Sequence, residues 1–248
     1  MKRRTFGFLS ADKQTKIYAV KWEPEDGELK GILQISHGMI EYVERYEGFA
    51  EYMVKQGFMV VGNDHLGHGK SVKSEELWGY FAAKDGSDIV VEDLNHLRKI
   101  IQKEHPDTPY FILGHSMGSF LLRKYLSRYG SGLNGAVIMG TGNQPAGVAV
   151  MGKFICRVLA LFCGWNHRCP LVEKMALGGN NKRFRDEGTP AAWLTKDKEI
   201  VKAYQKEPVY ISRRQPSRLR RNCPPGPLPL PPEEGAAPLE WHLHLPAD

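Results

Sequence analysis

Hydrophobic and polar positions follow two periods along the first 140 residues. Short apolar runs predict strands at 17–22, 29–36, 58–61, 110–113 and 135–139. Longer stretches, where apolar residues recur every three or four positions, predict helices at 45–56, 88–104 and 119–128. Because strands alternate with helices after the first two strands, we expect an α/β fold with a mostly parallel, doubly wound sheet.

The pattern changes after the strand at 135–139. From Asn143 to about Glu207 only helical patterns continue, which predicts a helical cap inserted after a core of residues 1–142. We expect the apolar residues of the cap, such as Met151 and Phe154, to pack against the core. A lipid-facing entrance to a binding site is the alternative.

Proline dominates the end of the chain. Ten of the 16 prolines lie at or after Pro208, and this density prevents strand formation. We interpret residues 208–248 as a disordered tail produced by a frameshift or a faulty gene model. A polyproline II ligand for proline-binding modules is the alternative.

Composition changes this picture little. The chain is 42% apolar and 25% charged with a mean hydropathy of −0.41, which is typical of a soluble globular protein. The longest apolar run, 148–165, contains Lys153 and Arg157, so we expect no stable membrane insertion. The net charge of +6 is scattered except for arginines within 213–221, so we expect no nucleic-acid partner.

The compartment is inferred from two further features. Polar residues from Ser10 onward interrupt any apolar stretch after the basic N-terminus, so no export signal is visible. We therefore expect a cytoplasmic protein with reduced thiols rather than a disulfide framework at the four cysteines, which are Cys156, Cys163, Cys169 and Cys223.

The candidate chemistry centres on Ser116. It lies in a G-x-S-x-G pentapeptide made of Gly114, His115, Ser116, Met117 and Gly118. The pentapeptide follows a buried-strand run and precedes a helix, which is the setting of a nucleophilic serine on a tight strand-to-helix turn. A serine that merely caps the helix is the alternative.

Acyl transfer also needs backbone amides directed at the developing oxyanion. The amide of Met117 follows the nucleophile, and that of Met39 follows an early strand and the pair His37, Gly38. We expect these two amides to form the oxyanion hole, and His37 to be a structural hydrogen-bonding residue rather than the base.

Three histidines, His37, His65 and His68, permit a metal-site interpretation. No carboxylate or cysteine has a recognisable ligand spacing to them. We favour a role for Asp64, His65 and His68 in structuring their loop, and expect neither a metal nor an organic cofactor.

Taken together, the chain resembles the monoacylglycerol lipase and lysophospholipase-like branch of the α/β-hydrolase superfamily, which is grouped with serine aminopeptidases. The shared motifs are His37-Gly38-Met39 with Glu41, Arg45 and Tyr46, the run Asn63 to Ser71, and Gly114 to Gly118. The resemblance covers about residues 8–207 and implies a serine hydrolase of monoacylglycerols, lysophospholipids or small acyl esters. It makes Ser116 the nucleophile and the amides of Met39 and Met117 the oxyanion hole. The sequence separately leaves open a transient membrane contact through the cap, without a clear basic amphipathic stripe to support it.

The resemblance fails in the last part of the chain. The family places its triad acid in a Gly-x-x-Asp-Pro-like loop and its base beside a Gly-x-x-His turn, and neither motif is present. The late residues His242, His244 and Asp248 have no scaffold to hold them near Ser116. We therefore predict little or no turnover, and a catalytically dead scaffold that binds ligands or partners is the rival function. We also predict poor solubility, because the strand 135–139 would be an uncovered sheet edge.

Overall fold

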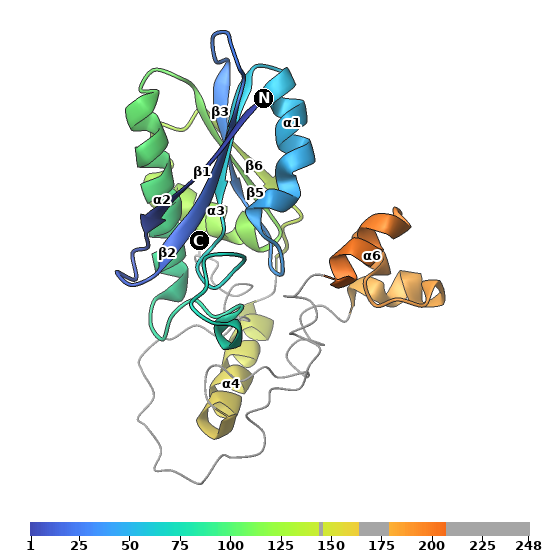
Figure 1. Cartoon of the computed structure of the whole chain (residues 1–248). Helices are drawn as coiled ribbons and strands as arrows, with labels where there is room; N and C mark the ends of the chain where they lie inside the picture. The colour runs from blue at the N-terminus through green and yellow to red at the C-terminus, as the bar shows by residue number, and fades with distance from the viewer. Residues whose placement is uncertain (144–145, 164–178, 207–248) are drawn as a thin grey trace. The chain divides into compact units, whose positions relative to one another are not determined.

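A computed structural model describes residues 1–143, 146–163 and 179–206 of the chain (Figure 1). The described residues form two compact units, of which the first runs from Met1 to Val150 and the second begins at Met151.

The first unit is built on a six-stranded sheet with the order β1-β2-β4-β3-β5-β6. Its strands are β1 (Lys2–Leu9), β2 (Lys16–Glu23), β3 (Gly31–Ser36), β4 (Phe58–Asn63), β5 (Tyr110–His115) and β6 (Gly135–Met139). The strands β4, β3, β5 and β6 are parallel neighbours, whereas β1 and β2 form an antiparallel hairpin and β2 pairs with β4 antiparallel. The predicted mostly parallel α/β sheet is confirmed.

Helices cover both faces of this sheet (Figure 1). The helix α1 (Glu47–Lys55) follows the 3-10 turn η1 (Val43–Tyr46) and packs on one face. The helices α2 (Gly86–Glu104) and α3 (Met117–Tyr129) pack on the other face, and the 3-10 turn η2 (Glu75–Leu77) lies in the loop before α2. The sheet is therefore doubly wound.

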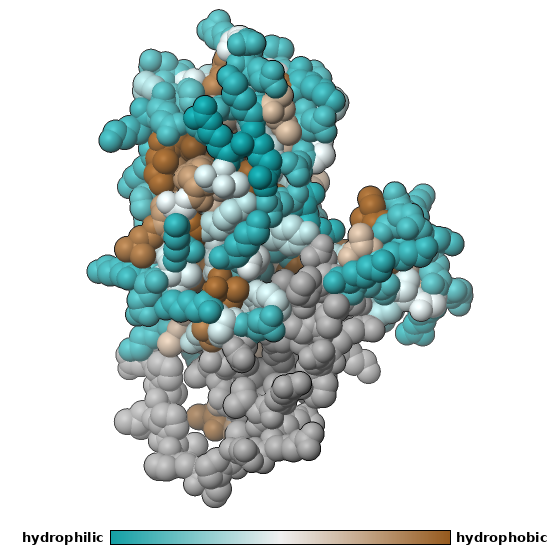
Figure 2. Space-filling model, viewed as in Figure 1, coloured by the Kyte–Doolittle hydropathy of each residue, from teal (hydrophilic) through white to brown (hydrophobic). Residues whose placement is uncertain are grey.

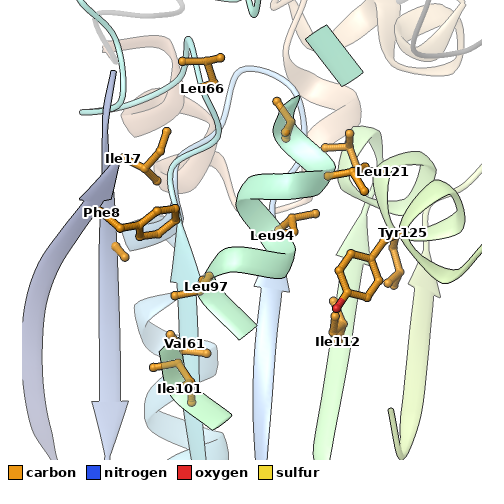
Figure 3. Packing of buried hydrophobic residues seen from close by; sticks show 14 of the residues in the cluster. Phe8, Ile17, Val61, Leu66, Leu94, Leu97, Ile101, Ile112, Leu121 and Tyr125 are labelled. Atoms are coloured by element: carbon orange, nitrogen blue, oxygen red, sulfur yellow. The ribbon is translucent and has the colours of Figure 1, made fainter. Parts of the chain in front are cut away.

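The period of two along each strand divides the core into two clusters. On the face under α2 and α3, the cluster includes Phe8, Ile17, Val61, Leu94, Leu97, Ile112, Leu121 and Tyr125 (Figure 3). On the face under α1, the alternate strand positions Trp22, Leu33, Val60 and Leu113 pack with Val54. Since successive side chains of a strand point to opposite faces, the same strands serve both clusters.

The strand β6 is the edge of the sheet among the described residues. Its side chains Val137, Ile138 and Met139 are 48%, 42% and 45% exposed. By contrast, most residues drawn in colour in Figure 2 are hydrophilic on the face shown. The apolar edge that we inferred from the sequence is therefore present in the described part of the chain.

After β6 the described residues contain helices only. They are α4 (Ala146–Cys163), the 3-10 segments η3 (Asn180–Glu187) and η4 (Ala192–Leu194), and α6 (Lys198–Lys206). That these helices form a cap over 143–207 stays a prediction, and the proline-rich segment 208–248 lies outside the described residues. Within the described ranges, no helix is both long and apolar enough to cross a membrane.

Candidate active site

Ser116 occupies a strained turn between β5 and α3. Its backbone angles are φ 52° and ψ −117°, a conformation that non-glycine residues rarely adopt. Its hydroxyl makes no capping hydrogen bond to the helix, so the interpretation as a helix-capping serine is not supported. The Ser116 N–H donates to the carbonyl of Met139 at the end of β6, at 2.9 Å, and this bond ties the turn to the next strand.

Two glycines of the pentapeptide allow the turn to form. A Cβ on Gly118 would lie 1.9 Å from the carbonyl oxygen of Ser36, and a Cβ on Gly114 would lie 2.5 Å from that of Gly118. Both contacts are with backbone atoms, which no side-chain movement relieves. The strand β5, the helix α3 and the end of β3 approach this closely only because residues 114 and 118 have no side chain.

The turn after β3 lies beside the nucleophile. A Cβ on Gly38 would stand 3.2 Å from the Cβ of Ser116, although the two residues are far apart in sequence. The amide of Met39 in this turn and the amide of Met117 at the start of α3 donate no hydrogen bond to any described residue. The structure thus brings the turn that contains Met39 next to the serine that precedes Met117.

The histidines behind this turn are buried and hydrogen-bonded. His37 donates from Nδ1 to the Gly38 carbonyl at 2.7 Å and accepts the His65 N–H at Nε2, at 3.0 Å. The His65 Nε2 lies 3.2 Å from both the Ser36 hydroxyl and the His37 carbonyl. Burial lowers the pKa of His65 to about 3 and that of His37 well below its ordinary value, so both rings are neutral near pH 7.

Ring packing completes this group of histidines. The ring centroid of His37 lies 4.1 Å from that of His65 and 5.5 Å from that of His68. His37 has one nitrogen bonded to a carbonyl and the other to an amide, so neither is directed at the Ser116 hydroxyl. This arrangement fits a structural role for His37.

Asp64 fastens the neighbouring loop. Its carboxylate accepts the amides of Val43 and Lys70, each at 2.7 Å. Burial raises the pKa of Asp64 to about 6, against the lowering effect of these two amides. A Cβ on Gly69 would lie 2.2 Å from the same carboxylate, so the loop closes around Asp64.

A second polar group lies at the nucleophile turn, and we call Glu41, Tyr46 and His115 the Glu41 cluster. The Glu41 Oε2 accepts the Gly38 N–H at 3.0 Å and the Tyr46 hydroxyl at 2.7 Å. The Nδ1 of His115 lies 3.4 Å from the same oxygen and 3.0 Å from the Tyr46 hydroxyl. Glu41 and Tyr46 belong to a shared sequence motif that does not reveal these contacts, although a glutamate three residues after Gly38 is placed to accept its amide.

No histidine of the described residues is hydrogen-bonded to the Ser116 hydroxyl. His115 precedes the serine but is directed at Glu41, and His37 is held at both nitrogens. The candidates His242, His244 and Asp248 lie outside the described residues. The described part of the chain therefore contains a candidate nucleophile and amide donors but no base in contact with the nucleophile.

Comparison with known protein families gives one match over most of the chain. The profile of the family described as serine aminopeptidase, S33, matches residues 27–222. This range includes the Glu41 cluster and the G-x-S-x-G pentapeptide, and it extends past Glu207.

Several curated relatives carry lipase names. The chain is 29% identical over 202 residues to a monoacylglycerol lipase of Mycolicibacterium smegmatis, covering 81% of this chain and 63% of that protein. It is 34% identical over 110 residues to the monoglyceride lipase of Homo sapiens, covering 44% of this chain and 34% of that protein. The chain thus spans less than two thirds of the length of these relatives.

Solved structures show the same fold. A thermostable carboxyl esterase from Bacillus coagulans superposes with a TM-score of 0.74 at 30% identity, covering 84% of this chain and 66% of that one. A structure described as a lipase in its open form superposes with a TM-score of 0.74 at 24% identity, covering 86% and 70%, and shows the likeness of fold alone.

Proposed function

Because the chain belongs to the serine aminopeptidase S33 family of α/β-hydrolases, we propose that its ancestral reaction is ester hydrolysis through an acyl-enzyme at Ser116. The serine oxygen bonds to the acyl carbon of the ester, and the alcohol leaves with a proton. Water then cleaves the acyl-serine bond and releases the carboxylic acid.

The backbone of Ser116 is the observation that supports this proposal most strongly. A non-glycine residue at φ 52°, ψ −117° is strained, and such strain persists where the surrounding structure enforces it. Here the strain presents a hydroxyl that does not cap its helix, beside the turn that contains Met39. We propose that the Met39 and Met117 amides receive the oxyanion that forms when the serine attacks.

The substrate class follows from the relatives and from α4. Relatives are named monoacylglycerol lipase or monoglyceride lipase, and we propose a monoacylglycerol, a lysophospholipid or a small acyl ester as substrate. Several apolar side chains of α4 are exposed, including Phe154 at 62% and Phe162 at 81%. An apolar helix surface of this kind suits contact with an acyl chain or transient contact with a lipid surface.

We further propose that this chain turns over esters slowly or not at all. The Ser116 proton needs an acceptor at hydrogen-bond distance, and none of the described histidines provides one. Oxyanion stabilisation and substrate binding without the triad retain only about 10³–10⁴-fold of rate enhancement over water in known serine hydrolases.

A fluorophosphonate probe and a short-chain p-nitrophenyl ester test the proposal on the full chain. We expect slow, stoichiometric labelling that Ser116→Ala abolishes, together with ester turnover near the background rate. Ser127→Ala is the matched control, because Ser127 is an exposed serine of the same helix that bonds only to the Lys124 carbonyl. Labelling that survives Ser116→Ala would refute the assignment, and ligand binding without any labelling would favour the scaffold function.

A further inference from the structure

The turn from Gly38 to Glu41 is held in an unfavourable conformation. Ile40 has a φ of 59°, in the left-handed region that a β-branched residue rarely enters. Ile40 is nevertheless 9% exposed, so its side chain is packed in this position. Strain of this kind requires compensating interactions from the surroundings.

Glu41 supplies such an interaction from within the turn. Its Oε2 accepts the Gly38 N–H at 3.0 Å, which closes the turn from residue 41 back to residue 38. With the Gly38 amide occupied by this bond, Met39 supplies the next amide of the turn, and it donates to no described residue. The carboxylate thus determines which amide of the turn remains available to a substrate oxygen.

The same oxygen links the turn to the nucleophile. Glu41 Oε2 lies 3.4 Å from Nδ1 of His115, the residue directly before Ser116, and accepts the Tyr46 hydroxyl at 2.7 Å. The Glu41 side chain is 14% exposed and that of His115 is 32% exposed, so the pair is partly shielded from water. One carboxylate oxygen therefore connects the turn after β3, η1 and the end of β5.

We propose that Glu41 is a positioning residue, whose carboxylate fastens the strained turn 38–41 to the nucleophile turn so that the Met39 and Met117 amides converge on one oxygen. This inference rests on the proposed function of Ser116 and adds a residue to that site. Glu41 acts through the turn and the His115 ring rather than by contact with the reacting atoms.

The electrostatics of the cluster agree with this geometry. Burial acts to raise the pKa of Glu41, but the hydrogen bond and charge of His115 and the Tyr46 hydroxyl outweigh it and lower the pKa to about 2. The hydrogen bond from Glu41 raises the pKa of His115 above its ordinary value, although burial opposes this. The carboxylate is therefore ionised at neutral pH, and hydrogen bonds to an ionised acceptor are the stronger kind.

The chain offers a matched control in Glu44. This glutamate also accepts a tyrosine hydroxyl, that of Tyr18 at 2.8 Å, and pairs with a cation, Lys70, at 2.8 Å. Its side chain is 21% exposed, close to the value for Glu41. Glu44 does not contact Gly38 or His115, so its substitution perturbs a similar polar network away from the nucleophile turn.

The test compares Glu41→Gln with Glu44→Gln in the full chain. Fluorophosphonate labelling is measured over a range of probe concentrations, which separates the labelling rate at saturation from the half-saturating concentration. We expect Glu41→Gln to lower the saturated rate about tenfold without changing the half-saturating concentration, since a misplaced oxyanion donor weakens only the transition state. Glu44→Gln is expected to label like the unmodified chain, with a comparable change in melting temperature.

Two further measurements keep the result interpretable. Tyr46→Phe removes one donor from Glu41 and is expected to lower the saturated rate by a smaller factor, about threefold. The amide proton resonance of Gly38 is expected to move in Glu41→Gln and to stay in place in Glu44→Gln, because only Glu41 accepts that amide.

The outcomes separate this inference from the proposed function. If the unmodified chain labels at Ser116 and Glu41→Gln labels equally fast, the positioning role is wrong and the nucleophile assignment stands. If Ser116 of the unmodified chain does not label at all, both are overturned. A drop in labelling of the same size in Glu44→Gln would show a general loss of structure and would also overturn the positioning role.

Discussion

Gly118→Ala would force the start of α3, which contains Met117, away from the end of β3, which leads into the turn with Met39. The added Cβ would lie 1.9 Å from the Ser36 oxygen, 2.5 Å from the Ser36 carbonyl carbon and 2.7 Å from the His37 oxygen, all backbone atoms. Real Cβ atoms essentially never approach within 3.0 Å, so the start of α3 has to withdraw from the end of β3. A withdrawal of about 1 Å is the scale at which misplaced catalytic groups lose about 100-fold in rate.

The same substitution has an expected cost in stability. Overpacking of a close-packed contact costs about 1–3 kcal/mol, which corresponds to a decrease in melting temperature of about 2–12 °C for a chain of this size. We expect fluorophosphonate labelling of Ser116 to fall about 100-fold, far more than a stability loss of this size explains while the protein remains folded. Thermal denaturation followed by circular dichroism gives the stability, and labelling well below the melting temperature gives the reactivity.

Gly48→Ala is the control for this experiment. Gly48 lies in α1, and a Cβ there would meet no atom within 4 Å. Replacing a helical glycine by alanine stabilises by about 0.5–1 kcal/mol, so this variant should label normally and melt no lower than the unmodified chain. Normal labelling and melting of Gly118→Ala would refute the close approach of α3 to β3 and, with it, the geometry proposed for the oxyanion hole.

Two further predictions concern stability and solubility. Burial raises the pKa of Asp93, which accepts from Ser10 and Ala11, to about 7 from the ordinary 3.8. Between these two pKa values the folded state holds a proton that the unfolded state has lost. The free energy of unfolding should therefore fall by about 3 kcal/mol from pH 4 to pH 8. Asp93→Asn should remove most of this fall, as measured by denaturant titrations at each pH. Ile138→Lys, on the exposed edge strand β6, should increase the soluble monomer fraction in light scattering. Ile200→Lys on α6, where the isoleucine is 49% exposed against 42% for Ile138, should change it less, and equal effects would contradict edge pairing as the cause.

Strong local periodicity explains how much of the fold the sequence predicts. The strand 135–139 is found with the expected bounds, and α2 begins at Gly86 and ends at Glu104, against an expected 88–104. The strand β1 was missed, because residues 2–5 are all exposed and Phe8 is the one buried residue among its eight. An edge strand with Lys2, Arg3 and Arg4 at its start has the charges that protect sheet edges, and the same charges conceal it from a hydrophobicity pattern.

The site divides in the same way into local and long-range parts. The turn at Ser116 could be predicted because the residue types that it requires lie within five consecutive positions, with glycine at 114 and at 118. The role of Glu41 could not, because it depends on the strained conformation at Ile40 and on a contact with His115 across 74 residues of sequence. A motif fixes residue types, but only the fold shows which carboxylate oxygen accepts which amide.

Ester hydrolysis by a serine needs both oxyanion stabilisation and proton transfer, and the described residues account only for the first. In the proposed mechanism, oxyanion stabilisation depends on the Met39 and Met117 amides, with Gly38, Gly118 and the Glu41 carboxylate holding them in place. Proton transfer depends on an imidazole at hydrogen-bond distance from the Ser116 hydroxyl, and no described histidine is hydrogen-bonded to that hydroxyl. A phosphonylating probe carries its own activated leaving group and needs the base less than an ester does. Slow but complete labelling of Ser116, with ester turnover near background, is therefore the pattern that this division of labour requires.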